Sequence, residues 1–181
     1  MSSEPRYVFP MDNAQPEGMR LDGRTFFVWR GLDAAGDDGD QEDRLATRGG
    51  KLVVFDSEEE CWSFALEAGW PTITPEDRDS DAQVMDLDPA LDWLRGRRAT
   101  VDPASALDLW NMTTEVAFST GRRFDDRGRV RENCYTKLFA ANVPYAFDLV
   151  AYVPRWKPQE LRVLREVLGQ AVHVFREPLP A

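Results

Sequence analysis

Several short segments concentrate apolar residues in the way that is typical of β-strands. Residues 24–30 place aromatic and β-branched side chains between two arginines, and residues 51–55 read Lys-Leu-Val-Val-Phe. Residues 83–86 and the apolar run at 146–153 are two further candidates. Residues 171–176 alternate Val172, Val174 and Arg176 against His173 and Phe175, which predicts a closing strand. We therefore expect a small β-sheet.

Apolar residues at helical spacing, together with start and stop residues, predict five helices. Ser57 and Glu60 form a capping box before the first helix, which we expect to end at Gly69. Asp-Pro pairs open the next two, because aspartate caps a helix and proline suits its first turn. The expected helices cover residues 58–68, 89–95, 103–120, 132–142 and 158–168.

The order of these elements predicts the fold class. Strands come first, several helices follow and a strand closes the chain, which is not regular βαβ alternation. We expect one α+β domain over residues 24–181, with a small mixed β-sheet and about five helices packed on it. Residues 1–23 are rich in Pro, Gly, Asp and Asn without periodicity, and we expect an extended N-terminal lead-in there. Apolar residues on more than one face of 103–120 place Trp110 in the core.

Charge is distributed unevenly along the 181 residues. The formal net charge is −10, and residues 1–95 carry 22 acidic and 9 basic residues, against 10 acidic and 13 basic residues in 96–181. The acidic half would repel nucleic acid and anionic membranes, whereas it would attract a basic protein. Acidity that only keeps the protein soluble is the alternative explanation.

The N-terminus and the cysteines point to a reducing compartment. Residues 1–10 lack a basic segment followed by an apolar run, and no apolar stretch approaches the roughly 20 residues that span a bilayer. The two cysteines, Cys61 and Cys134, lie in apolar helical segments and are expected to be buried and free. We therefore expect a cytoplasmic protein.

The residue patterns that carry catalysis or bind cofactors are not recognisable in this chain. The single histidine, His173, has no zinc-ligand partners at suitable spacing, and Gly49–Gly50 precede a strand rather than follow one. Asp77, Asp79 and Asp81 imitate a calcium loop, but Ala82 stands where the sharp turn needs glycine. We expect no catalytic residue, metal ligand or cofactor, and interpret the acidic segment as a solvated connector.

Two acidic stretches, 33–43 and 76–88, are the expected partner-binding surface, because their carboxylates have few matching bases. The candidate residues are Asp37, Asp38, Asp40, Glu42, Asp43, Asp77, Asp79 and Asp81.

Three segments together resemble a known class of protein. They are Gly50–Glu60 after an aromatic strand, Leu107–Met112 at the start of a helix, and Glu160–Phe175 near the C-terminus. Their rhythm is similar to that of the small actinobacterial immunity proteins encoded next to polymorphic toxins. The resemblance implies a protein that binds a cognate toxin, expected to be a basic domain, and blocks it by occlusion.

Two other functions remain open from the sequence. One is a regulatory or structural binding module without a toxin, and the other is an enzyme whose site is assembled only in three dimensions. A deep pocket lined by ionisable groups with perturbed pKa values favours the enzyme. A flat acidic face with exposed aromatic side chains favours a binding protein.

Overall fold

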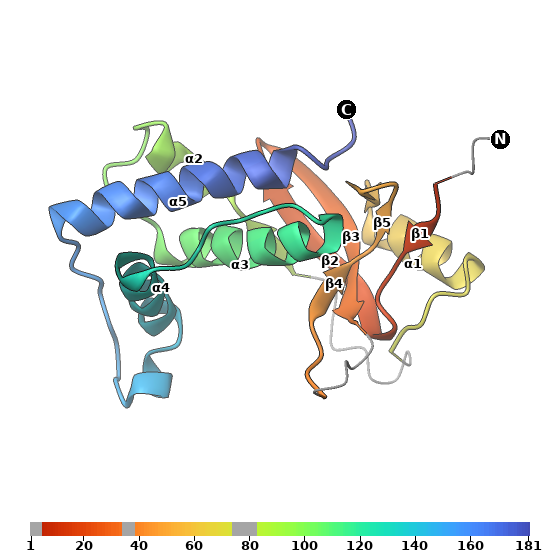
Figure 1. The fold of residues 1–181 in the computed structure, drawn as a ribbon, viewed down its shortest axis with the longest axis horizontal. Coiled ribbons are helices and arrows are strands. Elements are labelled where there is room, and N and C mark those ends of the chain that lie inside the picture. Colours follow the sequence, from red (N-terminus) through yellow and green to blue (C-terminus); the bar gives the residue numbers. More distant parts are fainter. Residues whose placement is uncertain (1–4, 34–38, 74–82) are drawn as a thin grey trace.

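The structure, a computed structural model, describes residues 5–33, 39–73 and 83–181. Its strands are β1 (Tyr7–Val8), β2 (Asp12–Leu21), β3 (Arg24–Leu32), β4 (Asp43–Leu45), β5 (Thr47–Arg48), β6 (Lys51–Leu52), β7 (Val54–Phe55) and β8 (Val84–Asp86). Its helices are α1 (Glu58–Glu67), α2 (Asp88–Leu94), α3 (Pro103–Thr120), α4 (Arg129–Asn142), α5 (Pro158–Arg176) and the short 3₁₀ helix η2 (Pro144–Phe147). The α+β fold and its mixed sheet are confirmed (Figure 1).

The main sheet has the strand order β4-β3-β2-β8, with β7 also paired to β3. β2 and β3 are antiparallel, whereas β2 and β8 are parallel, so the sheet is mixed as expected. β1, β5 and β6 form a second, smaller sheet. β8 confirms the strand expected around residues 83–86.

The expected lead-in over residues 1–23 missed a central strand. Residues 12–21 form β2, which pairs along most of its length with β3. The two strands are joined by Asp22 and Gly23, whose φ angles are 54° and 74°. Positive φ at both positions is the geometry of the tight hairpin turn that an Asp-Gly pair favours. The domain therefore begins N-terminal to residue 24.

A bulge in this hairpin lies next to Arg30, which pairs with Gln15. The β2–β3 register shifts between Asp12 and Gln15. Opposite the shift, a Cβ on Gly31 would lie 2.6 Å from the Asp12 carbonyl oxygen, so only glycine permits this approach. Because side chains alternate along a strand, buried Trp29 points to one face of the sheet and Arg30 to the other.

Each face of the sheet has its own apolar core. On one face, Trp29, Phe55 and Trp70 pack with Cys61 and Ala65 of α1. On the other face, β2 and β3 pack against α2, α3 and α5, and the buried residues there include Trp110. The two cysteines are buried and free, as expected.

The helix starts follow the expected capping only in part. The Ser57 hydroxyl accepts a hydrogen bond from the Glu60 N–H at 3.1 Å, but the Glu60 carboxylate accepts from the Asp56 N–H instead of Ser57. Asp102 caps α3 by accepting from the Ser105 N–H at 2.9 Å. Asp88 is the first residue of α2 and accepts from the Gly23 N–H of the hairpin turn.

The C-terminal strand was predicted wrongly, because α5 continues through Gly169 to Arg176. Its buried residues continue at helical spacing beyond the glycine, and Gly169 has open space around it. A glycine inside a helix costs only about 1 kcal/mol, which an apolar stripe on both sides outweighs. His173 therefore lies on a helix. The expected strand over residues 146–153 is also absent, since η2 and an extended segment occupy it.

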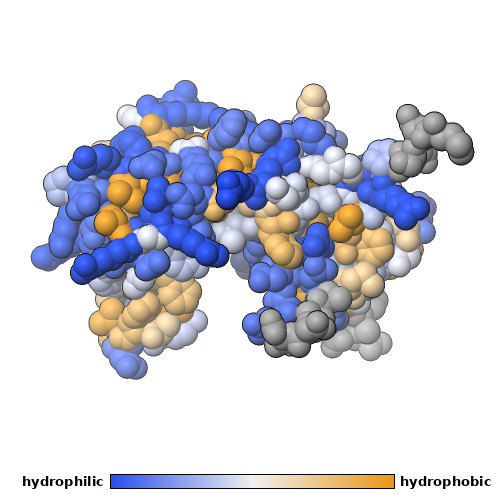
Figure 2. Space-filling view, in the orientation of Figure 1, coloured by the Kyte–Doolittle hydropathy of each residue, from blue (hydrophilic) through white to orange (hydrophobic). Residues whose placement is uncertain are grey.

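The molecule is elongated and has two lobes. The sheet and α1 form one lobe, and α2, α3, α4 and α5 form the other (Figure 1). Residues 144–153, which comprise η2 and the segment after it, extend below α4 (Figure 1), and we call them the leg. The molecule is hollowed between the leg and the sheet, and apolar surface covers the leg (Figure 2).

Candidate partner-binding cleft

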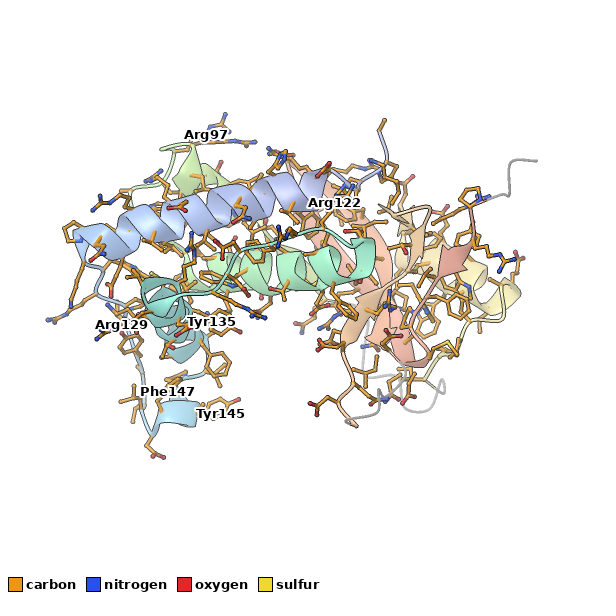
Figure 3. The ribbon with its side chains drawn as sticks, in the orientation of Figure 1. Arg97, Arg122, Arg129, Tyr135, Tyr145 and Phe147 are labelled. Atoms are coloured by element: carbon orange, nitrogen blue, oxygen red, sulfur yellow. The ribbon has the colours of Figure 1, made fainter. Side chains whose placement is uncertain are left out.

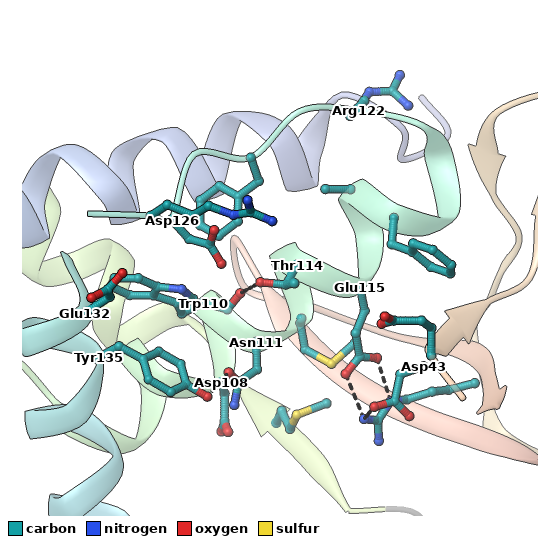
Figure 4. A pocket seen from close by; sticks show the side chains of 18 of the residues that line it. Asp43, Asp108, Trp110, Asn111, Thr114, Glu115, Arg122, Asp126, Glu132 and Tyr135 are labelled. Atoms are coloured by element: carbon teal, nitrogen blue, oxygen red, sulfur yellow. Dashed lines mark hydrogen bonds and ion pairs between the residues drawn. The ribbon is translucent and has the colours of Figure 1, made fainter. Parts of the chain in front are cut away.

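An open cleft of about 1030 Å³ runs along α3. It is bounded by Arg30 of β3 and Asp43 of β4 at the sheet and by Tyr135 of α4 at the other end, and the segment that begins at Arg122 runs back along α3 between these two ends (Figure 4). Three arginines and twice as many carboxylates line it. The carboxylates are Glu42, Asp43, Asp108, Glu115, Asp126 and Glu132.

Arg30 is the centre of an ion-pair cluster that joins the sheet to α3. Its Nε and Nη2 atoms donate to the two carboxylate oxygens of Glu115, each at 2.7 Å. Asp43 of β4 lies 3.5 Å from Nη2, and Glu17 of β2 lies 3.6 Å from Nη1. One guanidinium therefore serves three carboxylates, and the cluster keeps a net negative charge.

Burial and the mutual attraction of the charges shift the pKa values in this cluster. Burial raises the pKa of Glu115 and of Glu17 above their usual range, although the hydrogen bonds and charge of Arg30 oppose that effect. Burial by itself lowers the pKa of Arg30, but the surrounding carboxylates outweigh it and raise the pKa further. The guanidinium is thus firmly charged, while burial makes the ionised forms of Glu115 and Glu17 less favourable than they are in water.

Among the described residues, none supplies Asp108 with a counter-charge. It lies half-buried on α3, seven residues before Glu115 and so on nearly the same helix face. Burial and, secondarily, the charge of Asp102 raise the pKa of Asp108. Within the described ranges it has no hydrogen bond or ion pair. A cation entering the cleft would supply the missing partner.

Aromatic side chains form the wall beside Asp108. Trp110 of α3 packs edge-on against Tyr135 at 5.5 Å and against Phe124 at 6.4 Å between ring centroids. The Tyr135 hydroxyl donates to the Asn111 Oδ1 atom at 2.9 Å. Aromatic faces attract cations, so this wall and the carboxylates favour the same kind of ligand.

The other two arginines neutralise little of this charge. Arg122 points away from the cleft (Figure 4), and there it bonds Glu177 at 3.2 Å and the Gly50 carbonyl oxygen at 3.1 Å. Arg127 is exposed at the rim. The cleft therefore presents an excess of negative charge.

The structure brings only part of the predicted acidic surface to this cleft. Glu42 and Asp43 line it, while Asp40 is exposed in the segment before β4. The other candidates, including the calcium-like segment, lie outside the described residues: Asp37, Asp38, Asp77, Asp79 and Asp81.

The sequence reasoning missed Glu17, Asp108 and Glu115. A signal for the two α3 residues was present, because charged residues at helical spacing inside a helix with a broad apolar stripe need a polar environment. Glu17 carried no such signal, since β2 itself was not recognised.

Among the described residues, neither the cysteines nor any cluster of metal-binding side chains adds reactive chemistry to the cleft. Burial raises the pKa of the Cys61 thiol and, with Glu160, raises that of Cys134 to about 11, so both are poor nucleophiles. Among the described residues, no group of three or more His, Cys, Asp or Glu side chains is placed to hold a metal ion.

Comparisons of the chain with protein-family models, with curated proteins and with solved structures find no match. Along the stretches that the structure describes, no helix is both long enough and apolar enough to cross a bilayer.

Proposed function

We propose that this chain is an immunity-type protein that binds a cognate toxin and blocks it by occlusion. The observation that supports this most directly is the cleft along α3, in which the carboxylates outnumber the guanidinium groups and no described residue supplies Asp108 with a counter-charge. Complementary charge speeds encounter with a basic partner and disfavours wrong partners. A protein bound there would lie against the concave side of the molecule.

The energetics of Asp108 support a binding role. Burial raises the pKa of Asp108, so its ionised form lowers stability and contributes little to the fold. Such a cost is common where charge is kept available for a ligand. The partner would recover that cost by placing an ammonium or guanidinium group against this carboxylate.

A growth-rescue experiment tests this function. A test bacterium expresses the toxin domain encoded beside this chain, with or without the chain, and growth is recorded. The chain should restore growth, and the purified protein should abolish the activity of the toxin at equal molar ratio. Continued growth arrest with the chain stably present would contradict the proposal.

A pair of charge-matched variants locates the effect. Asp126→Lys with Glu132→Lys reverses charge at the cleft, and Glu59→Lys with Glu67→Lys makes the same change in net charge on α1, across the sheet. Rescue should fall with the first variant and persist with the second. Equal rescue by both would show that the cleft is not the contact surface.

An enzyme is the second candidate, since a raised carboxylate pKa in a cleft is also typical of a general acid. Asp108 would be that acid, because both oxygens of Glu115 are taken by Arg30. Asp108→Asn separates the two functions. An enzyme would lose nearly all turnover, whereas an inhibitor would keep blocking its target with weakened affinity.

A further inference from the structure

The leg carries the most exposed apolar surface in the described part of the chain. Val150 is 101% exposed, Val153 82% and Tyr145 78%. Only one of its ten residues, Asp148, is charged, in a chain whose charged fraction is 30%. Contiguous apolar surface of this kind on a folded protein marks an interaction site.

Backbone hydrogen bonds hold the first part of the leg in a defined shape. The Ala146 N–H donates to the carbonyl oxygen of Val143, just before η2, at 3.1 Å, and the Leu149 N–H, just after η2, donates to that of Pro144 at 3.1 Å. Beyond the leg, Lys137 of α4 donates to the Arg155 carbonyl oxygen at 2.8 Å and lies over the Trp156 ring. A surface fixed in advance loses less entropy when a partner binds it.

Aromatic contacts make the leg continuous with the cleft. The ring of Tyr135, in the cleft wall, stacks on Phe139 with centroids 6.4 Å apart, and Phe139 packs edge-on against Phe147 of η2 at 6.0 Å. Tyr135 and Tyr145 project toward the hollow between the leg and the sheet (Figure 3). One concave surface thus has an acidic end at Asp108 and an apolar end at Tyr145.

We propose that this surface recognises a protein segment in which a basic side chain adjoins apolar ones. The arginine or lysine enters the cleft beside Asp108 and the Tyr135 ring, and the apolar side chains cover Tyr145 and Phe147. A volume of about 1030 Å³ accommodates several side chains. A second copy of the chain is disfavoured as occupant, because a net charge of −10 on each copy opposes their association. The inference rests on the proposed function only for the identity of the partner.

Three synthetic peptides of equal length test the recognition without that partner. The first alternates Arg and Leu, the second replaces Leu with Ser, and the third replaces Arg with Glu. Binding to the ¹⁵N-labelled chain is followed by amide chemical shifts. The Arg-Leu peptide should bind about tenfold or more tightly than either other peptide, because it alone satisfies both ends of the surface. Shifts should concentrate around residues 108–115 and in the leg.

Two exposed apolar positions supply a matched pair of variants. Tyr145→Ser removes the largest exposed side chain of the leg, and Leu66→Ser makes a similar change on α1, where Leu66 is 62% exposed. Tyr145→Ser should weaken binding of the Arg-Leu peptide several-fold and leave binding of the Arg-Ser peptide unchanged. Leu66→Ser should change the affinity of neither peptide.

Similar affinities for all three peptides, no measurable binding of any, or equal effects of the two variants would overturn the inference. These outcomes are independent of growth rescue. If the chain neutralises a toxin but fails the peptide test, the proposed function stands and the proposed recognition mode is wrong. If it passes the peptide test but does not neutralise a toxin, only the recognition mode stands.

Discussion

Truncating Trp110 to alanine distinguishes a core residue from a binding hot spot at the cleft. Trp110 is 2% exposed and its ring contacts Phe124 and Tyr135 edge-on. Burying a tryptophan side chain removes about 150–250 Å² from water, worth roughly 4–6 kcal/mol at ~25 cal/mol per Å². Because the cleft lies beside it, neighbouring groups and water can fill part of the space. We therefore expect a loss of about 3–5 kcal/mol in the free energy of unfolding.

The assay is a thermal melt of purified Trp110→Ala beside the wild type and Trp110→Phe. For a domain of this size, the expected loss lowers the melting temperature of Trp110→Ala by roughly 6–20 °C. Trp110→Phe keeps an aromatic ring in the site and should fall between the two. A wild-type melting temperature in Trp110→Ala, combined with lost partner binding, would refute the core assignment and make Trp110 a hot spot.

Three further predictions concern charge. Arg30→Met leaves Glu115 and its neighbours without their shared cation and should lower the free energy of unfolding, measured in urea, by about 3 kcal/mol. Adding Glu115→Gln should recover part of that loss, and no recovery would mean that the pair is not coupled. Burial raises the pKa of Asp108, so its ionised form destabilises the native state above that pKa. Asp108→Asn should therefore melt above the wild type near neutral pH, with a difference that vanishes as pH falls toward about 3.9; a difference independent of pH would point to another cause. Neutralising four acids of the acidic stretch 33–43 should slow association with a basic partner and flatten its salt dependence, and an unchanged association rate at low salt would remove this stretch from the interface. Those acids are Asp37, Asp38, Asp40 and Asp43.

Local signals predicted most of the helices, because caps and apolar stripes act over a few residues. Ser57 and Asp102 cap α1 and α3, and Gly121 ends α3 with φ at 69°. The prediction for the end of α5 was wrong because Gly169 and the short alternation after it suggested that the helix stops there. Tertiary packing decided otherwise, since Phe175 near the helix end packs against Phe26 of β3 at 6.4 Å.

β2 was missed because Pro16 and Gly18 are poor strand formers, although the Asp22-Gly23 pair that closes its hairpin is a strong local signal. The cleft was out of reach for a different reason. Arg30 and Glu115 are 85 residues apart in sequence, and only the packing of α3 on the sheet makes them partners. Long-range ion pairs of this kind leave no periodic pattern to read.

Hydrogen–deuterium exchange on the complex with the toxin domain tests most directly whether the concave surface is the interface. Partner binding should slow exchange in α3 from Asp108 to Glu115, in residues 122–132 and in the leg. Exchange in α1, across the sheet, should stay unchanged. Protection confined to α1 or to the outer side of α5, with the α3 cleft and the leg exchanging as in the free protein, would contradict it.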